Sequence, residues 1–177
     1  TLTDDAVRSF DARFKMNPPL REIVDVDGVQ RAVARGTVDA IATDHAPHTL
    51  EEKQERSYFK VPAGLPLVQH ALAMALELVH DGILSLPQLV HKVSHGPAEL
   101  FNVRERGYLR EGYWADLTLV DMQTPQRIER ADVLYKCGWS PLEGDTLRSR
   151  VTATVGAHFS GSTARVATAQ RARAARR

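Results

Sequence analysis

The sequence has one cysteine, almost no net charge and no long apolar run. Its single Cys137 excludes a disulfide within the chain and fits a reducing compartment. A net charge of +1 gives no overall field that would attract nucleic acid or an anionic membrane. No apolar stretch approaches the roughly 18 residues of a membrane-spanning helix. We therefore expect a cytoplasmic protein with no nucleic acid and no membrane as partner.

Reactive side chains are concentrated in the stretch Asp39–Lys53. It begins as an apolar run and breaks abruptly into Asp44, Pro47 and His48. Pro47 prevents Asp44 and His48 from lying one turn apart on a regular helix, so we predict that Asp44 ends a strand and His48 lies in the following loop. Parallel α/β barrels carry their catalytic and ligand-binding groups at such strand ends. The same residues are also typical of a solvated turn, and a metal site needs three or more ligands where this stretch has one or two.

The pattern before this stretch indicates an α/β fold. Alternation in Ala12–Met16 predicts a strand that ends at Asn17, whose amide suits recognition of a polar ring. Val24–Arg35 has helical spacing, and Val38–Thr43 predicts a second strand. A strand–helix–strand unit places Asn17 and the end of the second strand at one edge of a parallel sheet. Taken alone, Asn17 is more typical of an Asn-Pro turn without a ligand.

A polar loop and two helices follow. Residues 50–61 are long and charged enough for an active-site loop, and the next turn brings Gly64 to the same edge, where a backbone can approach a ligand closely. Leu65–His80 predicts a helix that ends at Asp81-Gly82, and a second helix begins near Leu86. Four histidines lie on these two helices, and we expect them to pack or face solvent: His70, His80, His91 and His95.

The pattern changes after Phe101 to short strands separated by turns. The predicted strands are 107–109, 112–114, 115–121, 132–135 and 150–155. We expect Trp114 and Trp139 to be packing residues. The predicted organisation is therefore barrel units over 1–102 and a small β domain over 103–155, followed by an Ala- and Arg-rich tail over 156–177 that is disordered or non-native.

Three motifs make the chain resemble the dihydroorotases of the amidohydrolase superfamily. They are Lys15–Arg21 (KMNPPLR), Ala42–Lys53 (ATDHAPHTLEEK) and Gly138–Gly144 (GWSPLEG). The run Gly112–Leu117 (GYWADL) is similar to a signature of the whole superfamily, so it is less specific. The resemblance covers about Thr3 to Val155.

The resemblance implies the C-terminal part of a metal-dependent (β/α)8 amidohydrolase barrel with a small β domain. It implies reversible interconversion of dihydroorotate and N-carbamoyl-L-aspartate in pyrimidine synthesis, with zinc as the cofactor. Asp44 matches the aspartate that contacts the metal and moves a proton between the attacking water and the ring nitrogen. Asn17, His48, Ala63 and Gly64 match substrate-binding positions.

Other features of the family have no match in this sequence. The remaining zinc ligands and the arginine that pairs with the substrate carboxylate are expected upstream of Thr1, and a (β/α)8 barrel needs about 250 residues, so we expect a fragment. A non-catalytic dihydroorotase-like subunit that scaffolds aspartate transcarbamoylase, or an inactive truncated product, stays open as an alternative. The expected partner is the small-molecule substrate, and a homo-oligomer is also open.

Overall fold

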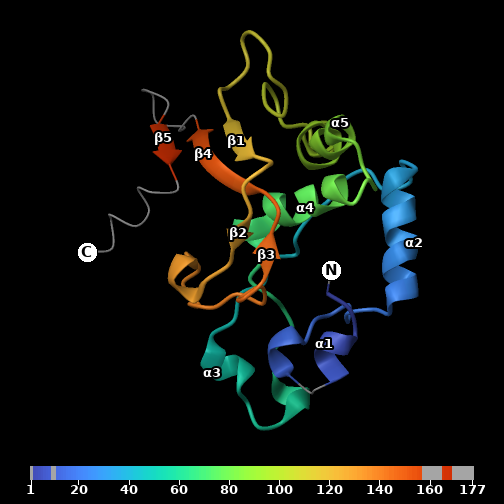
Figure 1. Cartoon of the computed structure of the whole chain (residues 1–177), viewed down its shortest axis with the longest axis vertical. Coiled ribbons are helices and arrows are strands. Elements are labelled where there is room, and N and C mark those ends of the chain that lie inside the picture. Colours follow the sequence, from blue (N-terminus) through green and yellow to red (C-terminus); the bar gives the residue numbers. More distant parts are fainter. Residues whose placement is uncertain (1, 9–10, 157–164, 169–177) are drawn as a thin grey trace. The chain divides into compact units, whose positions relative to one another are not determined.

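The computed structural model describes residues 2–8, 11–156 and 165–168 (Figure 1). Its α-helices are α1 (Asp5–Arg8), α2 (Ile23–Ala34), α3 (Leu50–Lys53), α4 (Ala71–His80), α5 (Leu86–Val90) and α6 (Gly96–Leu100). The 3-10 helices are η1 (Ala12–Phe14), η2 (Tyr58–Lys60), η3 (Val68–His70) and η5 (Arg130–Asp132), and η4 (His91–His95) is a π-helix. The strands are β1 (Leu117–Asp121), β2 (Gln126–Arg127), β3 (Thr146–Leu147), β4 (Arg150–Gly156) and β5 (Arg165–Thr168). Within the described residues, no helix has both the length and the apolar character needed to cross a membrane.

The chain forms two compact units, each assembled from several segments. The first unit contains the residues up to Val38 together with Ala42–Ala71 and Arg127–Thr146. The second contains Asp39–Ile41, Leu72–Gln126 and the residues from Leu147 onward. The division at residue 102 stays a prediction, because the units group residues by spatial contact and each unit takes segments from both predicted domains.

The prediction of a strand over Ala12–Met16 is wrong. Ala12–Phe14 forms the 3-10 helix η1, and the Asp11 side chain caps it by accepting a hydrogen bond from the Arg13 amide. The Arg13 guanidinium bonds the same carboxylate. A local cap that satisfies the backbone overrides alternating hydrophobicity when no neighbouring strand pairs with the segment.

The predicted strand over Val38–Thr43 is also absent. The segment lies outside regular structure, and the Ile41 amide donates a single 3.0 Å hydrogen bond to the Lys92 carbonyl in the second unit. An apolar run becomes a strand only where a neighbour supplies a continuous ladder. Among the described residues, the one isolated bridge comes just afterwards, between His45 and Leu65, and it is parallel.

The two long helical predictions are confirmed with shifted boundaries. Helix α2 agrees closely with the predicted Val24–Arg35, and Gly36 follows it with a φ of 82°. The helix predicted from Leu65 begins only at Val68, as η3, and continues as α4. Leu65 instead forms the bridge to His45, and Pro66 has no amide hydrogen to donate.

The helix predicted from Leu86 is interrupted by a wider turn. Helix α5 begins with a capping box between Ser85 and Gln88, as its sequence favours. The π-helical η4 then precedes Pro97, which cannot donate the regular i→i−4 hydrogen bond. A Cβ on Gly96 would lie 2.9 Å from the Asp39 carbonyl oxygen, so glycine is needed where these two segments of the second unit meet.

The second unit contains a three-stranded antiparallel sheet in the order β1-β4-β5 (Figure 1). Leu117 pairs with Val155 and Asp121 with Arg150, and the register shifts between Leu119 and Val120. Exposed and partly buried residues alternate along β4, as expected for a strand with one covered face. The strands predicted over 115–121 and 150–155 are thereby confirmed in position.

The strands predicted over 107–109, 112–114 and 132–135 are wrong. Gly107 and Gly112 both have a φ of 81°, which turns the chain instead of extending it. A Cβ on Gly107 would lie 2.5 Å from that of Ala98, so the turn packs closely on α6. In the last segment, the Asp132 carbonyl and the Leu134 amide bond the Gln69 side chain, and no strand partner is involved.

Part of the predicted tail is described. Strand β5 pairs with β4 in antiparallel register, from Ala153 opposite Thr168 to Gly156 opposite Arg165. Residues 157–164 and 169–177 lie outside the described residues, so a disordered or non-native segment stays a prediction there.

Candidate functional site

All five residues predicted for the site belong to the first unit. They are Asn17, Asp44, His48, Ala63 and Gly64. The bridge between His45 and Leu65 places the segment after Asp44 beside the segment after Gly64, and the Ala46 amide donates a 3.0 Å hydrogen bond to the Leu65 carbonyl. The structure therefore brings together two of the predicted binding segments.

Asp44 has an unusual backbone conformation. Its φ is 46°, in the left-handed region that few residues other than glycine adopt, although aspartate tolerates it better than most. The residue is exposed, and within the described part of the chain its carboxylate has no hydrogen bond and no ion pair. A free carboxylate held on a strained turn is suited to accept a proton or to bind a cation.

His48 has a defined orientation. Its Nε2 lies 3.2 Å from the Ala63 carbonyl oxygen, which can only accept, so Nε2 carries the hydrogen. Its Nδ1 lies 3.6 Å from Oε2 of Glu52. The His48 carbonyl oxygen accepts a 2.8 Å hydrogen bond from Nε1 of Trp139, a side chain that is only 2% exposed. His48 and Ala63 are thus in direct contact, and Trp139 fixes the backbone of His48.

The helix that follows His48 begins at a strong local signal. The Thr49 hydroxyl accepts a hydrogen bond from the Glu52 amide, and the Glu52 carboxylate accepts one from the Thr49 amide. This capping box starts α3 directly after the loop. The Thr49 amide bond is also the main reason that the pKa of Glu52 is lowered, and it holds the carboxylate near Nδ1 of His48.

Gly64 is required by two features of its position. Its φ is 140°, where residues with a side chain are strained, and a Cβ would lie 2.6 Å from both the Cβ and the carbonyl oxygen of Ala46. Its amide donates a 3.0 Å hydrogen bond to the Lys15 carbonyl. Gly64 therefore joins the segment after Asp44 to the segment that precedes Asn17.

Asn17 is exposed and follows Lys15 by two residues. Its peptide bond to Pro18 is cis. The hydrogen bond between Lys15 and Gly64 connects the Asn17 segment to the segment of Ala63 and Gly64. The hydrogen bond between Ala63 and His48 connects that segment in turn to His48. Hydrogen bonds thus link the segments of four predicted site residues, while Asp44 is linked through the neighbouring bridge.

Two further residues organise the site without having been assigned a role from the sequence. Nδ1 of His45 accepts hydrogen bonds from the amides of Leu67 and Val68, at 3.0 and 3.2 Å, which fixes the start of η3. Lys53 is 2% exposed, and burial, with a smaller effect from the Lys15 charge, lowers its pKa to about 8. The signal for Lys53 was present in the Glu-Glu-Lys end of the motif, but a lysine in a charged run is normally interpreted as solvated.

The histidines on the helices have packing contacts. His70 is 4% exposed and its ring lies edge-on to Tyr135. Nε2 of His80 lies 2.7 Å from Oγ of Ser149, and His95 stacks on Tyr108 at a centroid separation of 4.0 Å. These contacts support packing roles for His70, His80 and His95.

The two tryptophans differ in burial. Trp139 is buried as predicted, whereas Trp114 is 44% exposed and lies under the Arg106 guanidinium.

The described residues do not form a metal site by themselves. Among them, no group of three or more His, Cys, Asp or Glu side chains is positioned to hold an ion. A zinc ion needs three or four protein ligands, and Asp44 is a single exposed carboxylate. Asp44 can therefore serve only as one ligand of a site completed by other residues.

Comparison with known proteins gives a consistent result. Residues 17–166 match the model of the Amidohydrolase family. The chain is 40% identical over 156 residues to a dihydroorotase of Endomicrobium trichonymphae and 39% identical over 155 residues to one of Geobacter metallireducens. Each alignment covers 88% of this chain but only 37% and 36% of those proteins, so the chain spans little more than a third of their length.

Solved structures with the same fold are also found. An L-hydantoinase (dihydropyrimidinase) from Arthrobacter aurescens is 26% identical, with a TM-score of 0.79 over 86% of this chain and 35% of that one. A dihydropyrimidinase from Brevibacillus agri NCHU1002 is also 26% identical, with a TM-score of 0.75 over 82% of this chain and 32% of that one. With a family model that matches most of its length, the chain belongs to the amidohydrolase family.

Proposed function

We propose that the protein carrying this chain is a dihydroorotase, which interconverts dihydroorotate and N-carbamoyl-L-aspartate. The observation that carries the proposal is the identity of about 40% to curated dihydroorotases over 88% of the chain. The linked segments of Asn17, His48, Ala63 and Gly64 support it, because they bring side-chain and backbone hydrogen-bonding groups together, and the bridge between His45 and Leu65 connects them to the segment after Asp44. In this proposal residues 1–102 are part of a (β/α)8 barrel and residues 103–155 form a small β domain, and the protein works in the cytoplasm.

Asp44 is the proposed proton carrier. In the hydrolytic direction, water adds to the ring carbonyl carbon, the ring C–N bond breaks, and the proton lost by water reaches the departing nitrogen. A carboxylate without internal partners can take that proton and return it to nitrogen. The reverse order of the same transfers closes the ring.

The remaining residues of the proposed site bind substrate. The exposed Asn17 amide can donate to and accept from a cyclic imide, whose N–H and carbonyl groups alternate. His48 lies between the Ala63 carbonyl and the Glu52 carboxylate, so its ring is held in a fixed direction. The close approach that Gly64 permits lets backbone groups contact the ring.

Zinc is the proposed cofactor, and it would act as a Lewis acid on the amide carbonyl and lower the pKa of bound water. Of the residues described, Asp44 would contact it. The other ligands would come from residues beyond those that the structure describes, since the described residues gather no cluster of their own.

The test is turnover of dihydroorotate by the purified protein that carries this chain, with Asp44→Asn as the variant. Asparagine keeps the shape but cannot carry the proton, so we expect kcat to fall by a factor on the order of 10³. Asp27→Asn is the control, because Asp27 is an exposed carboxylate on α2, and it should leave kcat unchanged. Near-normal turnover by Asp44→Asn would refute its role.

A hydantoinase or dihydropyrimidinase activity is the second candidate, since solved proteins with these names share the fold. Both reactions open a cyclic amide, but dihydroorotate carries an additional carboxylate. The ratio of kcat/KM for dihydroorotate to that for dihydrouracil decides between them. We expect the ratio to favour dihydroorotate by a factor of at least about 10³, because a site built for a charged group discriminates strongly against a ligand that lacks it.

A further inference from the structure

Lys53 is a buried lysine without a carboxylate partner. It is the last residue of α3 and is 2% exposed. Within the part of the chain that the structure describes, no carboxylate lies within ion-pair distance of its ammonium group. A buried charge is costly unless hydrogen bonds compensate for it. The ammonium group must therefore obtain its stabilisation from other acceptors.

Those acceptors are two main-chain carbonyl groups. Nζ of Lys53 donates to the Lys15 carbonyl at 3.2 Å and to the Pro62 carbonyl at 2.9 Å. Both carbonyls lie in irregular segments, where no helix or sheet ladder supplies a donor. These part-buried carbonyls need donors, and a lysine with three donors and a long stem is well suited to bond both of them.

The positions of the two carbonyls connect Lys53 to the proposed site. Lys15 precedes Asn17 by two residues, and Pro62 is bonded directly to Ala63. The Lys15 carbonyl also accepts the 3.0 Å hydrogen bond from Gly64. One ammonium group therefore links the segment that carries Asn17 to the segment that carries Ala63 and Gly64.

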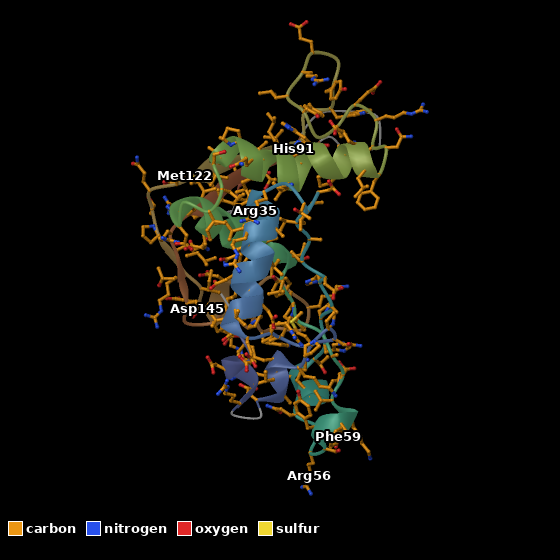
Figure 2. The ribbon with its side chains drawn as sticks, turned by 90° about the vertical axis from the view of Figure 1, so that its right-hand side faces the viewer. Arg35, Arg56, Phe59, His91, Met122 and Asp145 are labelled. Carbon is orange, nitrogen blue, oxygen red and sulfur yellow. The ribbon has the colours of Figure 1, made fainter. Side chains whose placement is uncertain are left out.

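A second lysine, Lys15, bonds the loop that runs from α3 to Ala63. Nζ of Lys15 donates to the carbonyls of Tyr58 and Phe59, at 2.8 and 3.3 Å, and lies over the Tyr58 ring. Figure 2 shows Arg56 and Phe59 together at the tip of this loop. Lys15 thus holds the outer part of the loop, whereas Lys53 holds its return to Ala63.

We propose that Lys53 is a positioning residue, which holds the substrate-binding segments of Asn17 and of Ala63-Gly64 against each other without contacting the substrate. The inference rests on the proposed function for its kinetic consequences, but the structural linkage does not depend on it. Lys53 does not bond the segment that carries Asp44. That segment is held separately, by the bridge between His45 and Leu65.

The first test measures the linkage itself, by amide hydrogen exchange of the purified protein. In Lys53→Met the apolar stem is kept and the donors are removed. We expect the Gly64 amide and the segments 15–17 and 62–64 to exchange about tenfold faster, while 86–100 is unchanged. Lys60→Met is the control, since Lys60 is an exposed lysine of the same loop, and it should change neither region.

The second test measures KM and kcat for dihydroorotate with the same two variants. Loss of the linkage should weaken substrate binding more than proton transfer by Asp44, so we expect KM to rise about tenfold in Lys53→Met while kcat stays within about threefold. A merely structural role would lower the amount of folded protein and reduce kcat without raising KM. Lys53→Arg, which keeps the donors, should recover most of the KM.

Each outcome decides a separate point. Unchanged exchange at Gly64 in Lys53→Met overturns the proposal, whatever the activity. Faster exchange there in a protein that does not turn over dihydroorotate keeps the linkage and overturns the proposed function. If Lys53→Met does not fold, Lys53→Gln is measured in its place, and failure of both variants to fold would overturn a role limited to these segments.

Discussion

The two compact units differ in what satisfies their backbone. In the second unit the three-stranded sheet and the helical run over 86–100 supply main-chain partners in regular ladders, and the cap of α5 is local. In the first unit, helix α2 satisfies its own backbone, but the irregular segments of the candidate site use side chains from distant parts of the sequence. Trp139 bonds the His48 carbonyl, Lys53 bonds the Lys15 and Pro62 carbonyls, and Gln69 bonds the Asp132 carbonyl and the Leu134 amide at the end of η5.

This difference has a consequence for mutations. A side chain that bonds irregular backbone holds several segments at once, so its loss affects more than its own position. A side chain on a ladder leaves the ladder intact when it is replaced. We therefore expect substitutions in the first unit to change stability and substrate binding together, and matched substitutions in the second unit to change stability alone.

The largest expected effect compares the two tryptophans. Trp139→Ala removes a large buried side chain and the donor to His48, and should lower the free energy of unfolding by about 3–5 kcal/mol. Trp114→Ala in the second unit removes a side chain that is 44% exposed, and should cost about 1 kcal/mol. Urea unfolding measures both. Equal losses would contradict the comparison.

The next expected effect is the pH dependence contributed by Lys53. Burial lowers its pKa from 10.5 to about 8 in the folded state, so the unfolded chain binds more protons between these values. The penalty for the buried charge is therefore complete below about pH 8 and is relieved as the pH rises toward 10.5. The free energy of unfolding should gain on the order of 3 kcal/mol over this interval.

Chemical denaturation at several pH values measures this contribution. In Lys53→Met the gain should disappear, while Lys60→Met should retain it, because Lys60 is exposed. A gain of equal size in Lys53→Met would mean that another group is responsible.

A smaller effect is expected from two glycine substitutions. Gly64→Ala introduces a Cβ within 2.6 Å of Ala46 at a φ of 140°, and should cost about 2–3 kcal/mol. Gly112→Ala in the second unit has a φ of 81° and no atom within 4 Å of the added Cβ, and should cost about 1 kcal/mol. Thermal unfolding compares the two. Only Gly64→Ala should also raise KM for the substrate.

The smallest effect sharpens the comparison most directly. Thr49→Ala and Ser85→Ala each remove one capping box, and each should cost about 1 kcal/mol. Because Thr49 begins the helix that carries Glu52 beside His48, its loss should also raise KM by a few-fold, whereas Ser85→Ala should leave KM unchanged. A KM change of similar size in both variants would remove the functional distinction between the units.

Prediction from the sequence succeeded where the deciding interactions are local. Helix α2 has apolar spacing and is followed by Gly36, and α5 has Pro87 at an early helical position, so both were located. Strand β4 shows clear alternation. The motif around Asp44 and His48 was found because its residues are contiguous, and His48 proved to contact Ala63, another predicted binding residue.

Prediction failed where partners lie far away in the sequence. Ala12–Met16 and Val38–Thr43 have strand-like patterns, but no described neighbour pairs with them, and local or isolated bonds take the place of a ladder. The role of Lys53 could not be seen either, because its acceptors are backbone atoms up to 38 residues away. Nothing in the side-chain pattern marks a carbonyl that needs a donor.

The sequence by itself determined the family, the contiguous motifs and the helices with their own caps, because these depend on residues within one or two turns of each other. Only the tertiary structure decided that Asp44 adopts a left-handed turn, that Gly64 must lack a side chain against Ala46, and that Lys53 is buried. The physical reason is that backbone hydrogen-bond partners and excluded volume depend on which distant segments meet, and the order of residues does not specify this directly.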